Sequence, residues 1–137
     1  MNDIVISTDK KLLDVVTIHT YLSERSYWAK GRSLETVKLT IANSLCFGVY
    51  NQEGKQLGFA RVATDYAVFG YLMDVFVLEE YRGQGIGKQL IEYIVEHPAI
   101  KNLRRIGLAT SDAHDLYRQF GFSSVSSPEK MMELVRT

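Results

Sequence analysis

The sequence predicts an α/β fold: one domain over residues 1–137, in which a central mixed sheet of antiparallel and parallel strands is flanked by helices. Three observations predict it. The chain of 137 residues has the length of one compact domain. Hydrophobic residues make up 46% of it and charged residues 23%, which is enough apolar surface for a core. The apolar residues have helical spacing near the N-terminus, strand-like runs in the middle, and alternating strand and helix patterns after that.

The N-terminal third is predicted to form one strand and two helices. Ile4–Ile6 is a short apolar run of the kind that forms a strand. Residues at helical spacing then indicate a first helix: Leu12, Val15, Val16, His19 and Leu22. Ser33 is a suitable N-cap for a second helix, because its hydroxyl can accept a hydrogen bond from a first-turn N–H group. Leu34, Val37 and Ile41 would share one face of that helix.

The middle of the chain is predicted to form an antiparallel meander of three strands. The first is Leu45–Tyr50, which the turn Asn51–Gly54 closes. Leu57–Thr64 follows as its hairpin partner, and Phe69–Leu78 is a long third strand. Short connections between such runs favour antiparallel neighbours.

Helices and strands alternate in the last third. The glycine-rich turn Arg82–Gly87 opens a helix whose inner face is formed by Ile86, Leu90, Ile91, Ile94 and Val95. The elements expected after it are a strand at Arg105–Ala109, a short helix at Asp112–Gln119, a strand at Phe122–Val125 and a further candidate strand at Met131–Val135. Because the strand before the glycine-rich turn and the strand after it are joined by a helix, these two strands are expected to run parallel.

Composition excludes several classes of function. Lys plus Arg total 16 and Asp plus Glu total 16, so the chain lacks the basic excess of a protein that binds nucleic acid through phosphates. Cys46 is the single cysteine, which excludes an internal disulfide and a multi-cysteine site, and we expect no metal. No apolar run is long enough for a membrane span, and the N-terminus lacks a signal-peptide pattern, so a cytoplasmic location is expected.

The turn Arg82–Gly87 admits several interpretations. A Walker-type phosphate loop would need a glycine at Arg82 and a serine or threonine at Gln89. The dinucleotide fingerprint G-x-G-x-x-G would need a third glycine where Lys88 stands. Two interpretations stay open. In the first, the turn presents unpaired backbone N–H groups at the start of a helix to a pyrophosphate, with Arg82 and Lys88 as flanking cations. In the second, the glycines only allow the chain to make a tight turn.

Two segments resemble a known family. Residues 77–90, VLEEYRGQGIGKQL, resemble the acetyl-coenzyme A motif of the GNAT N-acetyltransferase superfamily, Arg/Gln-x-x-Gly-x-Gly/Ala, with Arg82, Gly85 and Gly87 in its three defined positions. Residues 113–122, AHDLYRQFGF, resemble the second motif of that family. The order of predicted elements agrees with the GNAT fold over nearly the whole chain.

The resemblance implies an enzyme that transfers an acetyl group from acetyl-CoA, its co-substrate, to a primary amine of a small molecule or peptide by direct attack. It also implies a cofactor site. The backbone of Phe76, Val77 and Leu78 would line the pantetheine arm where two parallel strands separate. Thr110 stands where the family often has an asparagine, and can hydrogen-bond to the same arm. The pyrophosphate would be wrapped by Arg82, Gly83, Gln84, Gly85, Ile86, Gly87 and Lys88.

The resemblance gives Tyr117 the role of the acid that protonates the departing thiolate. A phenol suits this role, because its ordinary pKa of about 10 keeps it protonated at neutral pH. An ammonium acceptor must also lose a proton, and Asp74 is the best candidate for the base because it lies in an apolar strand. The alternative is that Asp74 is held in a salt bridge, since an unpaired buried charge is costly.

In this family the acceptor enters beside the loop that joins the first two helices, here residues 23–32. The acceptor-pocket candidates are Tyr27, Trp28, Asp65, Tyr71 and His114. The aromatic pair of Tyr27 and Trp28 would form a wall over an amine, or Trp28 would instead anchor the loop to the core. A second class of function stays open, a non-catalytic acyl-CoA-binding sensor or regulatory module. Edge strands after Phe122 make a homodimer an open possibility.

Overall fold

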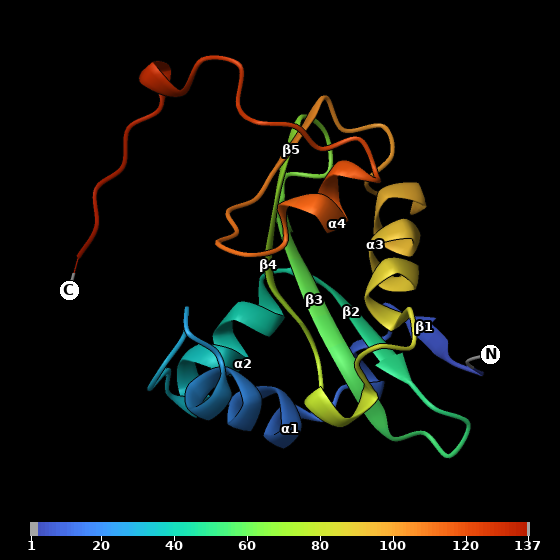
Figure 1. Ribbon diagram of the computed structural model, residues 1–137. Helices are drawn as coiled ribbons and strands as arrows, with labels where there is room; N and C mark the ends of the chain where they lie inside the picture. Colours follow the sequence, from blue (N-terminus) through green and yellow to red (C-terminus); the bar gives the residue numbers. More distant parts are fainter. Residues whose placement is uncertain (1–2, 137) are drawn as a thin grey trace.

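A five-stranded sheet forms the centre of the computed structural model, which describes residues 3–136 (Figure 1). The strands lie in sequence order across the sheet. The first four are antiparallel to their neighbours, and the fourth and fifth run parallel, which confirms the predicted mixed sheet. The strands are β1 (Val5–Ser7), β2 (Leu45–Tyr50), β3 (Gln56–Thr64), β4 (Phe69–Val77) and β5 (Arg105–Gly107).

Helices cover both faces of this sheet. One face is covered by α1 (Val15–Thr20), which continues as a π-helical turn (Tyr21–Arg25), and by α2 (Leu34–Ala42). The other is covered by α3 (Ile86–Glu96) and the short α4 (His114–Arg118). 3₁₀ turns lie at Lys10–Leu12, Glu79–Tyr81 and Pro128–Lys130. Within residues 3–136, no helix has the length and apolar content to cross a membrane.

The hydrophobic core lies on both sides of the sheet. Phe47, Val49 and Val62 point towards α3 and pack with Leu90 and Ile94 of that helix. Phe59 and Phe76 point the other way and pack with residues of α1 and α2, namely Ile18, Val37 and Ile41. This opposite burial follows from the alternation of side chains along each strand.

Caps define where the first two helices begin. The Ser33 hydroxyl accepts a hydrogen bond from Thr36 N at 3.1 Å, as predicted for α2. Asp14 caps α1 in the same way, because its carboxylate accepts from Thr17 N at 3.1 Å. The first helix begins later than its predicted pattern. Leu12 lies in the preceding 3₁₀ turn, ahead of the cap, and Val16 is 70% exposed. Of the residues in the predicted pattern, Leu22 is buried, together with Ile18 and Tyr21.

A β-bulge interrupts the pairing of β3 with β4. The register shifts between Phe59 and Arg61, and opposite this point Asp74 has a φ of +55°. A bulge places an extra residue in one strand and so changes which face the next side chains occupy. Here the neighbours Met73 and Asp74 both contact Arg61, instead of pointing to opposite faces of the sheet.

Two predicted C-terminal strands were wrong. Phe122–Val125 and Met131–Val135 have no regular structure, although the second segment is extended. A strand needs a neighbour for its backbone hydrogen bonds, and neither segment has one within the described part of the chain. The predicted strand at Arg105–Ala109 ends two residues earlier, at Gly107, because the chain there turns away from β4.

Candidate active site

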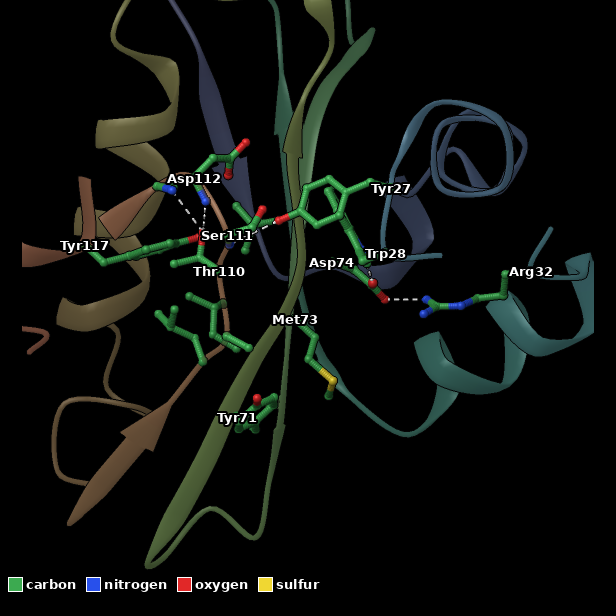
Figure 2. A pocket seen from close by; sticks show the side chains of 15 residues that line it. Tyr27, Trp28, Arg32, Tyr71, Met73, Asp74, Thr110, Ser111, Asp112 and Tyr117 are labelled. Atoms are coloured by element: carbon green, nitrogen blue, oxygen red, sulfur yellow. Dashed lines mark hydrogen bonds and ion pairs between the residues drawn. The ribbon is translucent and has the colours of Figure 1, made fainter. Parts of the chain in front are cut away.

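A cavity of about 490 Å³ lies where β4 and the segment after β5 separate (Figure 2). The two strands pair over three residues, Phe69–Tyr71 with Arg105–Gly107, and β4 then continues for six more residues without β5 beside it. The cavity occupies this opening. Its walls come from β4, from residues 108–113, from Tyr117 of α4, and from the loop between α1 and α2.

Asp74 lies in the cavity wall and is held by three donors. Arg61 Nε donates to its Oδ2 at 2.6 Å and Arg32 Nη1 to the same oxygen at 2.7 Å. Trp28 Nε1 donates to the other oxygen at 2.8 Å. Of the two interpretations of Asp74, the salt bridge is the one observed, and it links β4 to β3 and to the loop after α1.

The surroundings of Asp74 make it a weak base. Burial alone would raise the pKa of this carboxyl, but the hydrogen bonds and charges of Arg61 and Arg32 outweigh burial and hold the pKa below its ordinary value. A carboxylate with a lowered pKa and both oxygens engaged has little tendency to take a proton from an amine. The hydrogen bonds of Asp74 instead hold the cavity wall in place.

Tyr27 and Trp28 form an aromatic wall of the cavity. Their rings meet edge to face with centroids 5.0 Å apart. Trp28 is 39% exposed while its indole N–H is bound to Asp74, so it is both wall and anchor. The Tyr27 hydroxyl reaches across the opening and accepts a hydrogen bond from Ser111 N at 3.3 Å. The loop therefore bridges the cavity between its two sides.

Tyr117 lines the cavity from α4 and is only 8% exposed. Its ring packs edge to face on Phe122, with centroids 5.7 Å apart. Burial, with smaller contributions from Tyr27 and Asp112, raises the pKa of Tyr117 to about 12. Its hydroxyl is therefore protonated throughout the neutral range.

At the end of β4, one predicted cofactor residue turns its backbone away from β3. The N–H group of Leu78 donates to Leu57 O of β3 at 2.8 Å. Because backbone groups alternate along an antiparallel strand, those of Val77 point away from β3. Phe76, by contrast, stacks its buried ring on Tyr21 at a centroid distance of 4.1 Å. Of Phe76, Val77 and Leu78, it is therefore Val77 whose backbone faces the side where β5 no longer pairs with β4.

The glycine turn is open to solvent at the start of α3. Gly83 and Gly85 both have a φ of +81°, which favours glycine, and a Cβ at either would meet nothing within 4 Å. The first N–H groups of an α-helix have no partner within the helix. The Arg82 side chain turns back onto the body, where its Nε donates to Val77 O at 3.0 Å and its Nη2 donates to Tyr21 Oη. Lys88 is exposed in the first turn of α3.

Other predicted site residues lie elsewhere. Asp65 caps the turn between β3 and β4, where its carboxylate accepts from three backbone N–H groups, and it does not line the cavity. His114 lies with Asp115 and Arg118 in a polar hollow that shares Ser111 and Asp112 with the cavity, and it does not line the cavity itself. Thr110 and Tyr71 do line the cavity. The Thr110 hydroxyl also accepts from Ala113 N at 3.0 Å, at the start of α4.

Sequence reasoning missed the two arginines that hold Asp74. Arg61 is 8% exposed in the middle of an apolar strand, which was a detectable signal, because a buried cation needs an anionic partner. Arg32 had no such signal, since it follows a polar loop. Among the described residues that line the cavity, two are carboxylates, Asp74 and Asp112. Asp112 lies outside the network of Asp74 and the two arginines.

Comparisons with known proteins agree with this geometry. The sequence model of the "Acetyltransferase (GNAT) domain" matches residues 42–124. The chain belongs to the GNAT acetyltransferase family. It is therefore an acyltransferase of a family that uses acetyl-CoA as co-substrate.

Similar proteins come from distant organisms. A crystallised Xanthomonas campestris protein described as belonging to the GNAT family is 47% identical to this acyltransferase, covers 99% of this chain and 95% of its own, and superposes with a TM-score of 0.96. A Gibberella zeae protein, provisionally assigned as an acetyltransferase, is 31% identical over 84% of this chain and 76% of that protein. The thialysine N-epsilon-acetyltransferase of Bos taurus is 38% identical over 43% of this chain and 37% of that protein.

The ion pairs of Asp74 lead to a prediction about stability. Asp74→Asn leaves Arg61 buried without a counter-charge and should lower the free energy of unfolding by about 3 kcal/mol at pH 7. Because the pKa of Asp74 is lowered in the folded state, its contribution is complete above the ordinary aspartate value of about 3.9 and is lost as pH falls through the folded value. Urea unfolding of wild type and variant measures both effects.

The difference between the two proteins should therefore be constant from about pH 5 to 8 and should shrink below about pH 4. Glu53→Gln, an exposed change in the turn between β2 and β3, is the control and should leave stability unchanged. A pH-independent difference down to pH 3 would contradict the assignment.

Proposed function

We propose that this acyltransferase is an N-acetyltransferase that acetylates a primary amine held in the cavity beside β4. The observation that carries the proposal is that one cavity between diverging parallel strands joins two features. These are the protonated hydroxyl of Tyr117 and the aromatic wall of Tyr27 and Trp28. Acetyl-CoA, when bound, supplies an activated acetyl thioester.

The residues present fit acetyl-CoA. The backbone of Val77 faces away from β3, on the side where β5 has left β4, and its carbonyl is already bound by Arg82, so its N–H group is the one that an extended chain of amides would meet. The turn that follows presents N–H groups at the positive end of an eleven-residue helix, α3, which suits a pyrophosphate. Arg82 helps to hold the turn against β4 and Tyr21, so the anion would be bound mainly by backbone groups of Gly83–Lys88 with the Lys88 charge nearby.

Tyr117 is proposed to act as a hydrogen-bond donor towards the leaving sulfur. With a pKa of about 12, its hydroxyl is a weaker acid than a thiol with an ordinary pKa of about 8.5. Full transfer of its proton would cost roughly 5 kcal/mol at these values. Donating a hydrogen bond to the developing thiolate requires no transfer and stabilises charge where it forms.

The acceptor amine is proposed to lie against Tyr27 and Trp28. Aromatic faces attract ammonium groups, and Asp112 adds a carboxylate to the same cavity, which favours an amine that arrives as a cation. Arg32 and Arg61 neutralise the charge of Asp74, so this carboxylate is proposed to hold Trp28 in place and not to bind the amine. The name of the bovine relative, a thialysine N-epsilon-acetyltransferase, supports a small amine as substrate.

A titration followed by a thiol assay tests the function. Acetyl-CoA should bind in calorimetry, and free thiol should appear when a library of small amines and peptides is added. The chain's Cys46 is 1% exposed, and burial raises its pKa to about 11, so the protein itself should add little to the thiol signal. Binding without thiol release from any amine would contradict catalysis and favour an acyl-CoA sensor.

Replacing the phenol tests the donor role. Tyr117→Phe should lower kcat by about 10- to 100-fold, because a hydrogen bond to a charged group contributes about 1.5–3 kcal/mol. The affinity for acetyl-CoA should change less than about twofold, since the substitution removes one hydroxyl from a preformed cavity. Steady-state kinetics with Tyr93→Phe on α3 as control measure the effect, and an unchanged kcat in Tyr117→Phe would refute the role.

A matched pair of glycine variants tests the pyrophosphate site. Gly85→Glu places bulk and negative charge at the start of α3 and should weaken acetyl-CoA binding at least 100-fold. Gly54→Glu makes the same change in the turn between β2 and β3, where φ is +84° and a Cβ is equally unhindered. Calorimetric titration should find normal binding in Gly54→Glu. Equal affinity in the two variants would mean that the glycine turn has no part in the site.

A further inference from the structure

Two arginines share one carboxylate in the wall of the cavity, so their charges are not balanced. Asp74 carries one negative charge, and Arg61 and Arg32 both bind its Oδ2, at 2.6 and 2.7 Å. Within the described part of the chain, neither arginine forms an ion pair with any other carboxylate. A guanidinium group keeps its charge at every pH of interest. The group formed by Arg32, Arg61 and Asp74 therefore has one positive charge in excess.

Arg61 alone would be enough to neutralise Asp74. It is buried, and all of its guanidinium nitrogens are engaged. Besides the bond from Nε to Asp74, its Nη1 donates to Ser44 Oγ at 3.1 Å and its Nη2 donates to the Met73 sulfur at 3.6 Å. The positive charge that lacks a partner is consequently the charge of Arg32.

Arg32 faces the cavity with part of its guanidinium group unused. It lines the cavity, and its side chain is 21% exposed, against 2% for the side chain of Asp74. It reaches Asp74 through Nη1 alone. Within residues 3–136, its Nε and Nη2 donate no hydrogen bond. These two nitrogens lie on the same edge of the guanidinium plane, so one anion can accept from both at once.

We propose that Arg32 binds a carboxylate of the acceptor, so that the substrate is an amine that also carries a carboxylate, as an amino acid does. The proposal names the substrate class of the proposed acetyl transfer and rests on that function. One carboxylate supplies the one negative charge that is missing beside Arg32. Its two oxygens match the two N–H groups of the unused edge.

The charges in the cavity favour a carboxylate over a phosphate. A phosphate monoester carries a charge of about −1.5 to −2 at neutral pH, which exceeds the single positive charge in excess. Asp112 lines the same cavity and would repel the additional negative charge. A carboxylate leaves no such excess.

The two ends of the cavity suit the two ends of such a molecule. Figure 2 shows Arg32 at one end of the labelled residues and Tyr117 and Asp112 towards the other, with Tyr27 between them. A carboxylate held at Arg32 leaves the amine to extend along the aromatic wall of Tyr27 and Trp28. It would point towards Tyr117, where the proposed function has the leaving sulfur.

Matched amines that differ only by a carboxylate test the proposal. Lysine and cadaverine are one such pair, and ornithine and putrescine are another. In the thiol assay, the amino acid of the better pair should have a kcat/KM at least about 10-fold higher, mainly through a lower KM, because its partner loses a charged hydrogen bond. A higher kcat/KM for O-phosphoethanolamine than for β-alanine would contradict the preference for a carboxylate.

Arg32→Gln separates carboxylate binding from support of the wall. In this variant the ratio of kcat/KM between lysine and cadaverine should fall below about twofold. A change that acted only by disturbing the wall would slow both amines alike and leave the ratio as it was. Arg25→Gln is the matched control, because Arg25 does not line the cavity and its side chain is 45% exposed, and it should keep the wild-type ratio. The same ratio in Arg32→Gln as in wild type would overturn the assignment.

Calorimetric titration without acetyl-CoA distinguishes this proposal from the proposed function. Lysine should bind wild type at least about 10-fold more tightly than cadaverine, and Arg32→Gln should lose the difference. That result without thiol release would refute acetyl transfer and still support the carboxylate site. Thiol release with no preference for the carboxylate, in either rate or binding, would support acetyl transfer and refute the carboxylate site.

Discussion

A buried carboxylate shared by two arginines is the interaction on which the shape of the site depends. Asp74 joins β4 to Arg61 of β3 and, through Arg32 and Trp28, to the loop between α1 and α2. Taking three charges out of water is costly, and the cost is offset because both carboxylate oxygens accept hydrogen bonds from well-placed donors. Since removing any one partner would leave a charge or donor unmatched, the network favours a single arrangement of the cavity wall.

The backbone of β4 makes this arrangement possible. The strand leaves β5 after Tyr71, its bulge turns Met73 and Asp74 towards the same arginine, and a few residues later it turns the backbone groups of Val77 away from β3. The parts assigned to cofactor binding are thus largely backbone groups, at Val77 and at the glycine turn, whereas the parts assigned to chemistry and acceptor choice are side chains. The two tasks depend on different features of the sequence.

Much of this could be predicted from the sequence because it is local. The limits of β2, the start of α3 and the cap at Ser33 follow from apolar runs bounded by turn and capping residues. Tyr117 and the glycine turn were found through their motifs. The partners of Asp74 were not found, because Arg61 and Arg32 lie 13 and 42 residues away in the chain and only the tertiary fold brings them together. The C-terminal strands were predicted wrongly because apolar pattern reports burial potential and says nothing about whether a neighbouring strand exists.

The position of Trp28 also makes the site observable in solution. It is the chain's single tryptophan, its ring forms part of the cavity wall, and its indole N–H is bound to a carboxylate. Indole emission depends on the polarity and charge around the ring, so the whole fluorescence signal of tryptophan from this protein comes from the cavity wall. Entry of a ligand, movement of the loop and loss of the Asp74 contact can each be followed there without any attached label.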